Sequence, residues 1–392
     1  MPTTSRAFLR RRGAAVALAA TVLLAPFAQS AAAAESAAAP SSSVAAPSTD
    51  PATTVATIEA RTARAVARSL ADPAWQDRVE KAALASETVR LAPLADRADD
   101  EAAARTLAPR LHRAERRLAE AKGLDADTPP LLNLRLAADS MRAALADGRA
   151  PLVAAAPADE TARTVPAYDS RGRTHTLNVR SVPERPVYIV DVDATRALAA
   201  GMDVLREELT AQGLGGAAAR VADNAPTAQG GFWTTRITSV RLSDNKEPWV
   251  KGSSEIYTLV TGFGHDGKVR VDPVEMPYLD DEDHTYYPNQ VLVNWSYYKY
   301  NLADAVMMEE DGGTNYHDLA QALATALLTI TDQGMYIPLV NALLDAIPTD
   351  WWTDDPDYVD SWYTLAQGDR GTLNGAAGNG TMGVEPYFVD AL

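Results

Sequence analysis

The spacing of apolar side chains predicts helices in the first part of the chain. Between residues 55 and 149, apolar positions return every third or fourth residue, and one such stripe ends just before Gly123, a residue type suited to terminating a helix. A second stripe, from Leu131 to Leu145, predicts that another helix follows. We therefore expect residues 55–149 to form a small helical bundle.

The pattern then changes to short β-branched runs separated by turn residues. Runs of this kind occur between residues 150 and 192, and a helical stripe covers residues 194–212. We expect residues 150–212 to form a small β unit followed by a helix. Residues 213–230 are rich in Gly, Ala and Asn, which predicts a linker.

The remaining residues, 231–392, show short strand patterns separated by turn-rich loops. Val291 to Tyr297 alternates as a half-buried strand does, while residues 319–330 interpose a helical stripe. This pattern predicts an antiparallel β-sandwich with inserted helices. The fold class expected for the whole chain is therefore α+β and multidomain.

The N-terminal residues have the pattern of an export signal. Four arginines precede an apolar segment from Ala14 to Phe27, which is too short to span a membrane, and small residues suited to cleavage follow it. Residues 1–34 thus predict a signal peptide. Residues 35–54 consist mostly of Ala, Ser, Pro and Thr and predict a flexible linker. We expect a secreted protein without a transmembrane segment.

Composition restricts the chemistry further. The chain has no cysteine, so disulfides cannot hold its cores, and its formal net charge is −16. Most of that charge belongs to residues 230–392, where 25 Asp and Glu stand against 8 Lys and Arg, a net charge of −17. An acidic surface of this kind repels phosphate backbones and attracts cations, which argues against a nucleic-acid partner.

One segment is strongly basic, in contrast to the net negative charge of the chain. It lies in the predicted helical bundle and consists of Arg110, Arg113, Arg116 and Arg117. Such a run is suited to an anionic polymer. The alternative is a solvated helix face on which Glu115 and Glu120 pair with the arginines, and helical spacing favours this second interpretation.

The segment from Val306 to Asp318 is the strongest candidate for a metal site. An apolar step leads directly into Glu309, Glu310 and Asp311, two glycines follow, and a helical stripe begins at Asp318. We expect a strand, an acidic glycine loop and a helix. Calcium takes six to eight oxygen ligands, so carboxylates from at least two loops are needed.

Two further acidic loops supply such carboxylates. They are the turn that follows Leu242 and the loop from Asp280 to Asp283. The full set of predicted calcium ligands is Asp244, Glu247, Asp280, Asp281, Asp283, Glu309, Asp311 and Asp318.

The segments from Leu242 to Val250 and from Val306 to Asp318 carry a family resemblance. They are similar to the first and third calcium loops of the C-two-type β-sandwich found in protein kinase C and synaptotagmin. The resemblance implies that Asp244 and Glu247 are first-loop ligands and that Glu309, Asp311 and Asp318 are third-loop ligands. Taken as a whole, the chain resembles secreted proteins of high-GC bacteria that belong to no characterised family.

Other roles are open to the same acids. Asn315 is a favourable helix N-cap, and Asp318, three residues later, completes a pattern close to a capping box. The loop from Asp280 to Asp283 also fits an ordinary solvated loop.

Enzyme motifs are weak in this sequence. It contains no His-Glu-x-x-His, Gly-x-Ser-x-Gly or phosphate-binding glycine motif. Glycoside hydrolysis needs only two suitably placed carboxyl groups, and the pairs Trp351-Trp352 and Tyr286-Tyr287 are suited either to stacking on sugar rings or to a core.

Two functions from different classes follow from these patterns. The first is a secreted, calcium-binding module of the binding or adhesion type, whose partner is a carbohydrate or a cell-surface ligand. The alternative is a secreted hydrolase, a glycosidase first, that uses carboxylates of the same acidic loops.

Overall fold

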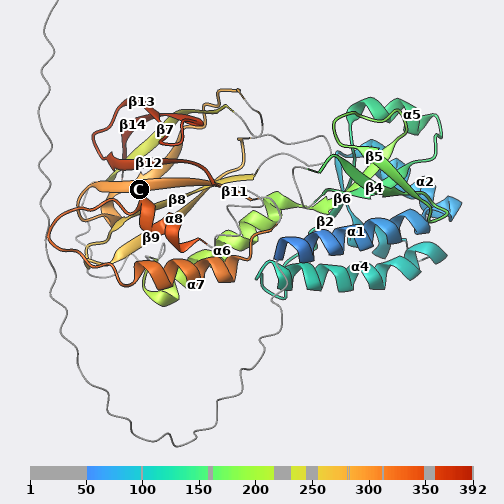
Figure 1. The fold of residues 1–392 in the computed structure, drawn as a ribbon, viewed down its shortest axis with the longest axis horizontal. Helices are drawn as coiled ribbons and strands as arrows, with labels where there is room; N and C mark the ends of the chain where they lie inside the picture. The colour runs from blue at the N-terminus through green and yellow to red at the C-terminus, as the bar shows by residue number, and fades with distance from the viewer. Residues whose placement is uncertain are drawn as a thin grey trace, which may run out of the picture. The chain divides into compact units, whose positions relative to one another are not determined.

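The computed structural model describes residues 51–98, 100–157, 162–215, 231–243, 255–279, 281, 283–310, 313–347 and 358–390. Within these residues the protein is α+β, with one six-stranded sheet, two four-stranded sheets and helices that pack on them (Figure 1). The predicted signal peptide lies outside the described residues, as do residues 35–50 of the predicted linker and residues 216–230.

Among the described residues up to 149, there are five helices and one short 3-10 helix. Their bounds are α1 Pro51–Ser69, α2 Pro73–Ala85, α3 Leu91–Asp96, α4 Ala102–Ala121, η1 Asp139–Met141 and α5 Arg142–Ala146. Helix α1 starts at a proline, which is favoured at the first helical position because it has no N–H to leave unbonded. Its start lies inside the range 35–54 that the composition predicts as linker.

The six-stranded sheet has the order β1-β2-β6-β3-β4-β5. Its strands are β1 Thr88–Arg90, β2 Leu132–Leu136, β3 Leu152–Ala155, β4 Thr164–Tyr168, β5 Thr174–Asn178 and β6 Val187–Val192. Strands β3 and β6 pair in parallel, and the other pairs are antiparallel. Helix α1 packs against β3, β4 and β6, and α4 packs against α1.

The prediction of a purely helical bundle over residues 55–149 is wrong in two segments, the first of which is the short strand β1. The apolar stripe from Leu131 to Leu145 divides into strand β2, the 3-10 helix and α5. Strand β2 lies between β1 and β6, and Leu132 and Leu134 are fully buried there. Within β2 the sequence is Leu-Asn-Leu-Arg-Leu, an alternation with the period of a strand that the longer helical stripe from Leu131 to Leu145 had obscured.

The second part of the chain contains two four-stranded antiparallel sheets. The first has the order β10-β7-β14-β13, formed by β10 Gln290–Asn294, β7 Phe232–Leu242, β14 Gly380–Val389 and β13 Gly371–Asn374. The second has the order β12-β11-β8-β9, formed by β12 Tyr358–Ala366, β11 Leu302–Glu310, β8 Glu255–Phe263 and β9 Val269–Met276.

Helices pack on the second of these sheets. They are α6 Ala194–Gln212, α7 Tyr316–Leu327 and α8 Val340–Ala346, and a 3-10 helix, η2 Trp295–Tyr297, follows β10. Helix α6 contacts β8, β9 and α7, and α8 contacts β11, β12 and α7.

Strands β8 and β11 are buried on both faces, and their sequences show why. Alternate residues such as Val260 and Met307 join the core shared with the other four-stranded sheet. The residues between them, such as Leu259 and Val306, join the core formed with α6 and α7. The two strands therefore read as continuous apolar runs, as strands covered on both faces do.

Most strand and helix positions predicted for residues 231–392 are confirmed. Strands occur where the alternation around Ile237, the run that begins at Glu255 and the segment before Glu309 predict them. The segment from Val291 is partly different: β10 contains a register shift between Val291 and Val293, and a 3-10 helix begins at Trp295. Among the described residues, no helix combines the length and apolar character needed to cross a membrane.

Candidate functional site

The acidic stretch that the sequence singles out is a strand end followed by a helix. Strand β11 continues through Glu309 and Glu310, so these two acids are not in a loop as expected. Asp311 and Gly312 lie outside the described residues. Helix α7 begins at Tyr316, and Asn315 is its N-cap, with its side chain accepting a hydrogen bond of 3.0 Å from the backbone N–H of Asp318. The capping role predicted for Asn315 is confirmed.

Glu310 turns into the protein and binds a lysine from a distant helix. The Nζ atom of Lys122 lies 2.6 Å from Oε1 of Glu310, and both side chains are fully buried. The hydroxyl of Tyr316 donates a hydrogen bond to the other carboxylate oxygen, and the Lys122 ammonium lies 5.7 Å from the centre of the Tyr316 ring. Glu310 thus forms a buried ion pair inside the fold and does not lie in the predicted acidic loop.

The backbone around this pair is joined as closely as the side chains. The C-cap of α4 is Lys122, whose carbonyl accepts from the N–H of Tyr316 at 3.0 Å. The carbonyl of Ala121 accepts from the side-chain amide of Asn315, also at 3.0 Å. Asn315 and Tyr316 therefore supply donors to the last carbonyls of α4, which have no partner within their own helix.

Gly123 is required at this junction. Its φ angle is +60°, and a Cβ atom there would collide with the side chain of Asn315. The sequence prediction that Gly123 ends the helix is confirmed, whereas the role of Lys122 carries no sequence signal that we can identify.

The other predicted calcium ligands are dispersed or already bonded. Asp244, Glu247 and Asp280 lie outside the described residues. The backbone N–H of Asp281 donates to the hydroxyl of Tyr286 at 2.9 Å.

The last two described candidates occupy different settings. Asp283 accepts from the guanidinium of Arg241 at 2.6 Å. Asp318 lies exposed in the first turn of α7. In the described part of the chain, no three His, Asp or Glu side chains gather in a way that would hold one metal ion.

Several buried aspartates serve the fold. Asp304 accepts hydrogen bonds from the hydroxyl of Tyr336 and from the N–H groups of Leu339 and Thr364, and burial raises the pKa of its carboxyl group. Asp360 accepts from the backbone N–H groups of the turn that leads into β14, including that of Gly380. Both carboxyl groups are thus saturated with internal donors and are not open to a substrate.

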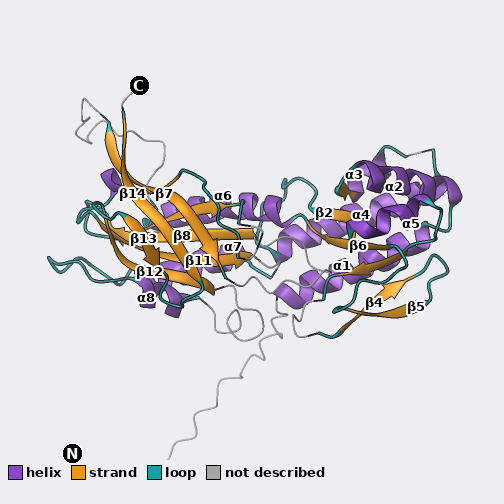
Figure 2. Ribbon diagram, turned by 90° about the horizontal axis from the view of Figure 1, so that it is seen from above, coloured by secondary structure: helices purple, strands orange, loops and turns teal. Residues whose placement is uncertain are grey.

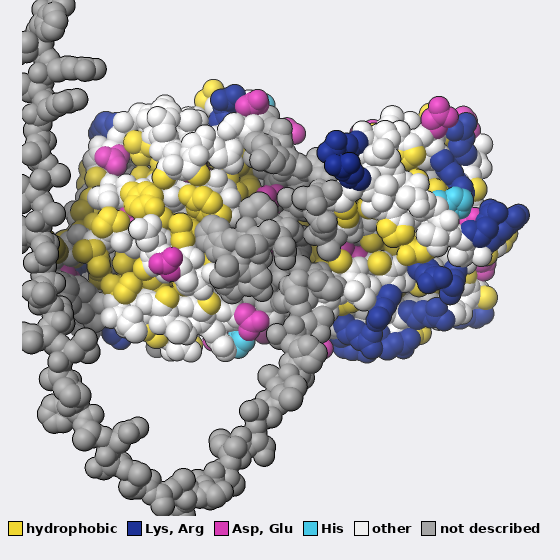
Figure 3. Space-filling model, in the orientation of Figure 1, with side chains coloured by type: hydrophobic (Ala, Val, Ile, Leu, Met, Phe, Trp, Pro, Cys, Tyr) yellow, Lys and Arg dark blue, Asp and Glu magenta, His cyan; other side chains and the backbone are white. Residues whose placement is uncertain are grey.

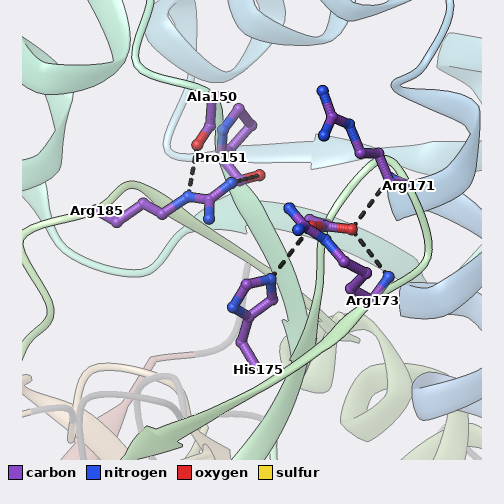
Figure 4. A network of polar contacts seen from close by, with 7 residues as sticks. Ala150, Pro151, Arg171, Arg173, His175 and Arg185 are labelled. Atoms are coloured by element: carbon purple, nitrogen blue, oxygen red, sulfur yellow. Dashed lines mark hydrogen bonds and ion pairs between the residues drawn. The ribbon is translucent and has the colours of Figure 1, made fainter.

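A third aspartate, Asp169, lies between β4 and β5 and organises their hairpin. Figure 4 labels its partners Arg171, Arg173 and His175. Its carboxylate accepts from the N–H groups of Arg171 and Arg173, from the guanidinium of Arg173, and lies 3.2 Å from the ring of His175. The hydrogen bonds from Arg173 and His175 hold the pKa of Asp169 well below its usual range, against the opposing effect of burial. This Asp–His pair stabilises a turn.

An exposed aromatic group at the end of two strands is the feature that the sequence analysis did not identify. Trp233 on β7, and Tyr387 and Phe388 on β14, are 45%, 40% and 37% exposed, and we call these three residues the aromatic ridge. Trp233 and Phe388 are partners across the two strands and share one face, whereas Tyr387 projects from the opposite face. Strands β7 and β14 run side by side to this end (Figure 2). The rings of Trp233 and Phe388 contact each other edge to face across the pair, with centroids 5.2 Å apart.

Charged side chains accompany Tyr387, on the face opposite to Trp233 and Phe388. Arg236 lies 4.1 Å from the centre of the Tyr387 ring and forms an ion pair with Glu385 on the neighbouring strand. Aromatic rings next to charged and hydrogen-bonding groups form the combination that recognises sugar rings, because the ring faces stack and the polar groups bond to hydroxyls. In the sequence, the signal that could have revealed this aromatic group is the pair Phe232-Trp233 at the start of a predicted strand.

The aromatic pairs that the sequence did propose are placed differently. Tyr286 is half-buried and pairs with Val240 in an isolated bridge, whereas Tyr287 is 72% exposed. Trp351 and Trp352 lie outside the described residues.

The comparisons with known proteins identify a family. Residues 63–391 match a family model described as "Protein of unknown function (DUF3103)". No curated protein and no solved structure matches the chain significantly.

Proposed function

Because the chain belongs to the DUF3103 family of proteins of unknown function, we propose a function from its own residues: it is an exported, non-catalytic binding protein that recognises carbohydrate through the aromatic ridge. The observation that carries the proposal is the exposure of Trp233 and Phe388, whose rings contact each other on one face of the strand pair, with Tyr387 exposed on the other face at the same end. Large aromatic side chains left in water together are a feature of binding surfaces.

The environment of the acids supports binding over hydrolysis. A glycosidase needs two carboxyl groups that face a bound sugar. The buried carboxyl groups of Asp304 and Asp360 instead accept internal hydrogen bonds, and Glu310 is bonded to Lys122. We keep the hydrolase as the alternative that the experiment below separates from binding.

The fold proposed for residues 231–392 is a β-sandwich-type binding module with helices on one side. Its support is the core that the two four-stranded sheets share. We further propose that calcium binds the acidic loops of this module, as their carboxylate-rich sequences predict. Export is proposed from the N-terminal sequence pattern alone.

The test is binding of soluble polysaccharides to the full chain, measured by affinity electrophoresis and calorimetry. Trp233→Ala and Phe388→Ala should each weaken binding by at least about fivefold, equivalent to roughly 1 kcal/mol for a lost stacking contact. Met335→Ala is the matched control, because it removes an apolar side chain that is 64% exposed and lies outside the ridge.

Two results would contradict the proposal. One is binding that survives both ridge substitutions but is lost in Tyr287→Ala, which would move the site to Tyr287. The other is release of reducing sugar by the purified wild type, which would establish the hydrolase.

A further inference from the structure

A groove lined by arginines runs between α1 and α4, on a part of the molecule that the proposed function does not use. It has a volume of about 280 Å³. Its charged lining consists of Arg61 from α1 and Arg110, Arg113 and Arg117 from α4, and we call it the arginine groove. Apolar side chains, among them Leu107, complete its wall. Lysine and arginine side chains gather over this region of the surface (Figure 3).

The two helices that form the groove have a strong excess of positive charge. Helices α1 and α4 contain eight arginines and three acids, namely Glu59, Glu115 and Glu120. Two of these acids are occupied elsewhere, because Glu59 accepts from the N–H of Val192 and Glu115 accepts from the N–H groups of residues 131 and 132. Only Glu120 remains on the exposed helix surface.

The sequence interpretation in which Glu115 pairs with the arginine run is therefore wrong. The Glu115 carboxylate is bonded to backbone at the start of β2, and burial raises the pKa of its carboxyl group. Among the described residues, no ion pair joins Arg110, Arg113 or Arg117 to an acid. The fold thus concentrates positive charge at this groove without neutralising it, which favours an anionic ligand.

The arginines of α4 extend along the helix over a distance greater than the size of a small anion. Arg105 and Arg116 line an adjoining hollow, and Arg113 lines both the hollow and the groove. From Arg105 to Arg117 the helix rises roughly 18 Å, at about 1.5 Å per residue. Guanidinium groups bind phosphate and sulfate in a bidentate manner, so a row of this length matches a chain of such groups.

We propose that the arginine groove binds a linear polymer of oxyanions, with phosphate or sulfate groups along its length. The rest of the chain supports a localised site, because residues 230–392 have a net charge of −17 and repel such a polymer. A lipid surface is the less suitable partner. None of the large apolar side chains that the described residues expose to solvent lies on α1 or α4, so this face offers nothing to insert into a bilayer.

The test uses the full chain and three probes: linear polyphosphate, heparin, and orthophosphate as the monomeric control. Binding is measured by calorimetry at two or more salt concentrations. The variant is Arg110→Gln, Arg113→Gln and Arg117→Gln together. The matched control changes three exposed arginines elsewhere, Arg90→Gln, Arg180→Gln and Arg370→Gln, and so removes the same total charge.

We expect the wild type to bind one or both polymers at least tenfold more tightly than orthophosphate, and the tighter polymer identifies phosphate or sulfate as the preferred group. The groove variant should lose at least tenfold in affinity. Its slope of log affinity against log salt should fall by roughly two, about 0.7 for each lost phosphate contact on a single-stranded polyanion. The control variant should keep the wild-type affinity to within twofold.

Equal losses in the two triple variants would overturn the proposal, because they would show attraction by total charge. Equal affinity for orthophosphate and the polymers would also overturn it in favour of a small-anion site. A third contradicting result is binding to vesicles of phosphatidylglycerol and phosphatidylcholine without binding to either polymer. Circular dichroism of both variants confirms that they are folded before any loss is interpreted.

Discussion

The ammonium of Lys122 lies 2.6 Å from the carboxylate of Glu310, although 188 residues separate them in the sequence. Lys122 caps the end of α4, and Glu310 ends strand β11. Taking two charges out of water is costly unless each finds the other in good geometry. The pair therefore makes the structure sensitive to the loss of either partner.

Lys122→Met tests this dependence. The substitution leaves Glu310 as a buried charge without its cation, and removing one partner of such a pair typically destabilises a protein by roughly 3–5 kcal/mol. Urea unfolding should show a loss of this size. The double variant Lys122→Met with Glu310→Gln removes both charges and should recover more than half of it. A double variant as unstable as the single one would show that the lysine acts through packing alone.

Gly201→Ala tests how closely α6 approaches α7. A Cβ atom at Gly201 would collide with the ring of Tyr316, which Glu310 holds in place through the tyrosine hydroxyl. Alanine normally stabilises a helix interior relative to glycine by about 1 kcal/mol, but overpacking here should reverse the sign and cost roughly 1–3 kcal/mol.

Gly368→Ala is the control for that substitution. A Cβ atom at Gly368 would meet no atom within 4 Å, so this variant should be neutral in thermal unfolding. If Gly201→Ala were also neutral, Tyr316 would have to be free to move away from α6.

The sequence predicts those elements whose signals are local. The helix end at Gly123 and the cap at Asn315 were predictable because φ > 0 and side-chain capping depend on one residue type at one position. Strand β2 was predicted as part of a helix, although Leu132, Leu134 and Leu136 alternate with the period of a strand, and pairing with β6 decides between the two patterns.

The same distinction applies to the candidate sites. The arginine run was visible in the sequence, but its interpretation depended on where Glu115 points, and the structure directs that carboxylate to the backbone of residues 131 and 132. The Trp233–Phe388 contact joins residues from opposite ends of the strand-rich part. No spacing rule within one segment could bring these two rings together.

Asp332 should govern part of the acid sensitivity. Hydrogen bonds from Lys299, then from Tyr300 and the N–H of Gly334, lower the pKa of Asp332 to about 2, from about 3.9 in an unfolded chain. A lowered carboxyl pKa stabilises the folded state above about pH 4, and this stabilisation is lost as the pH falls towards 2.

Asp332→Asn should therefore lower the urea midpoint at pH 7, and the difference from wild type should shrink between pH 4 and pH 2. Lys299→Gln removes the first of the three donors. It should therefore raise the pH at which the stabilisation is lost, towards the ordinary pKa of aspartate. A difference that stays constant over this pH interval would mean that the carboxylate of Asp332 does not gain its stability from these donors.

The last prediction concerns calcium and the helix cap beside the acidic stretch. Extracellular calcium sites often have dissociation constants of roughly 10⁻⁴ to 10⁻³ M, and a hundredfold excess of ligand stabilises the folded state by about 2.7 kcal/mol. If the acidic loops bind calcium as proposed, scanning calorimetry should show a melting temperature higher by roughly 5 °C in calcium than in chelator. Asp311→Ala should abolish this rise, because it removes a predicted ligand.

Asn315→Ala is the complementary variant. It removes the cap bond to Asp318 and the bond to the Ala121 carbonyl, so it should lower the free energy of unfolding in chelator by roughly 1–2 kcal/mol. The calcium response should remain. Equal melting temperatures of the wild type in chelator and in excess calcium would show that these acids are solvated and that no calcium site exists there.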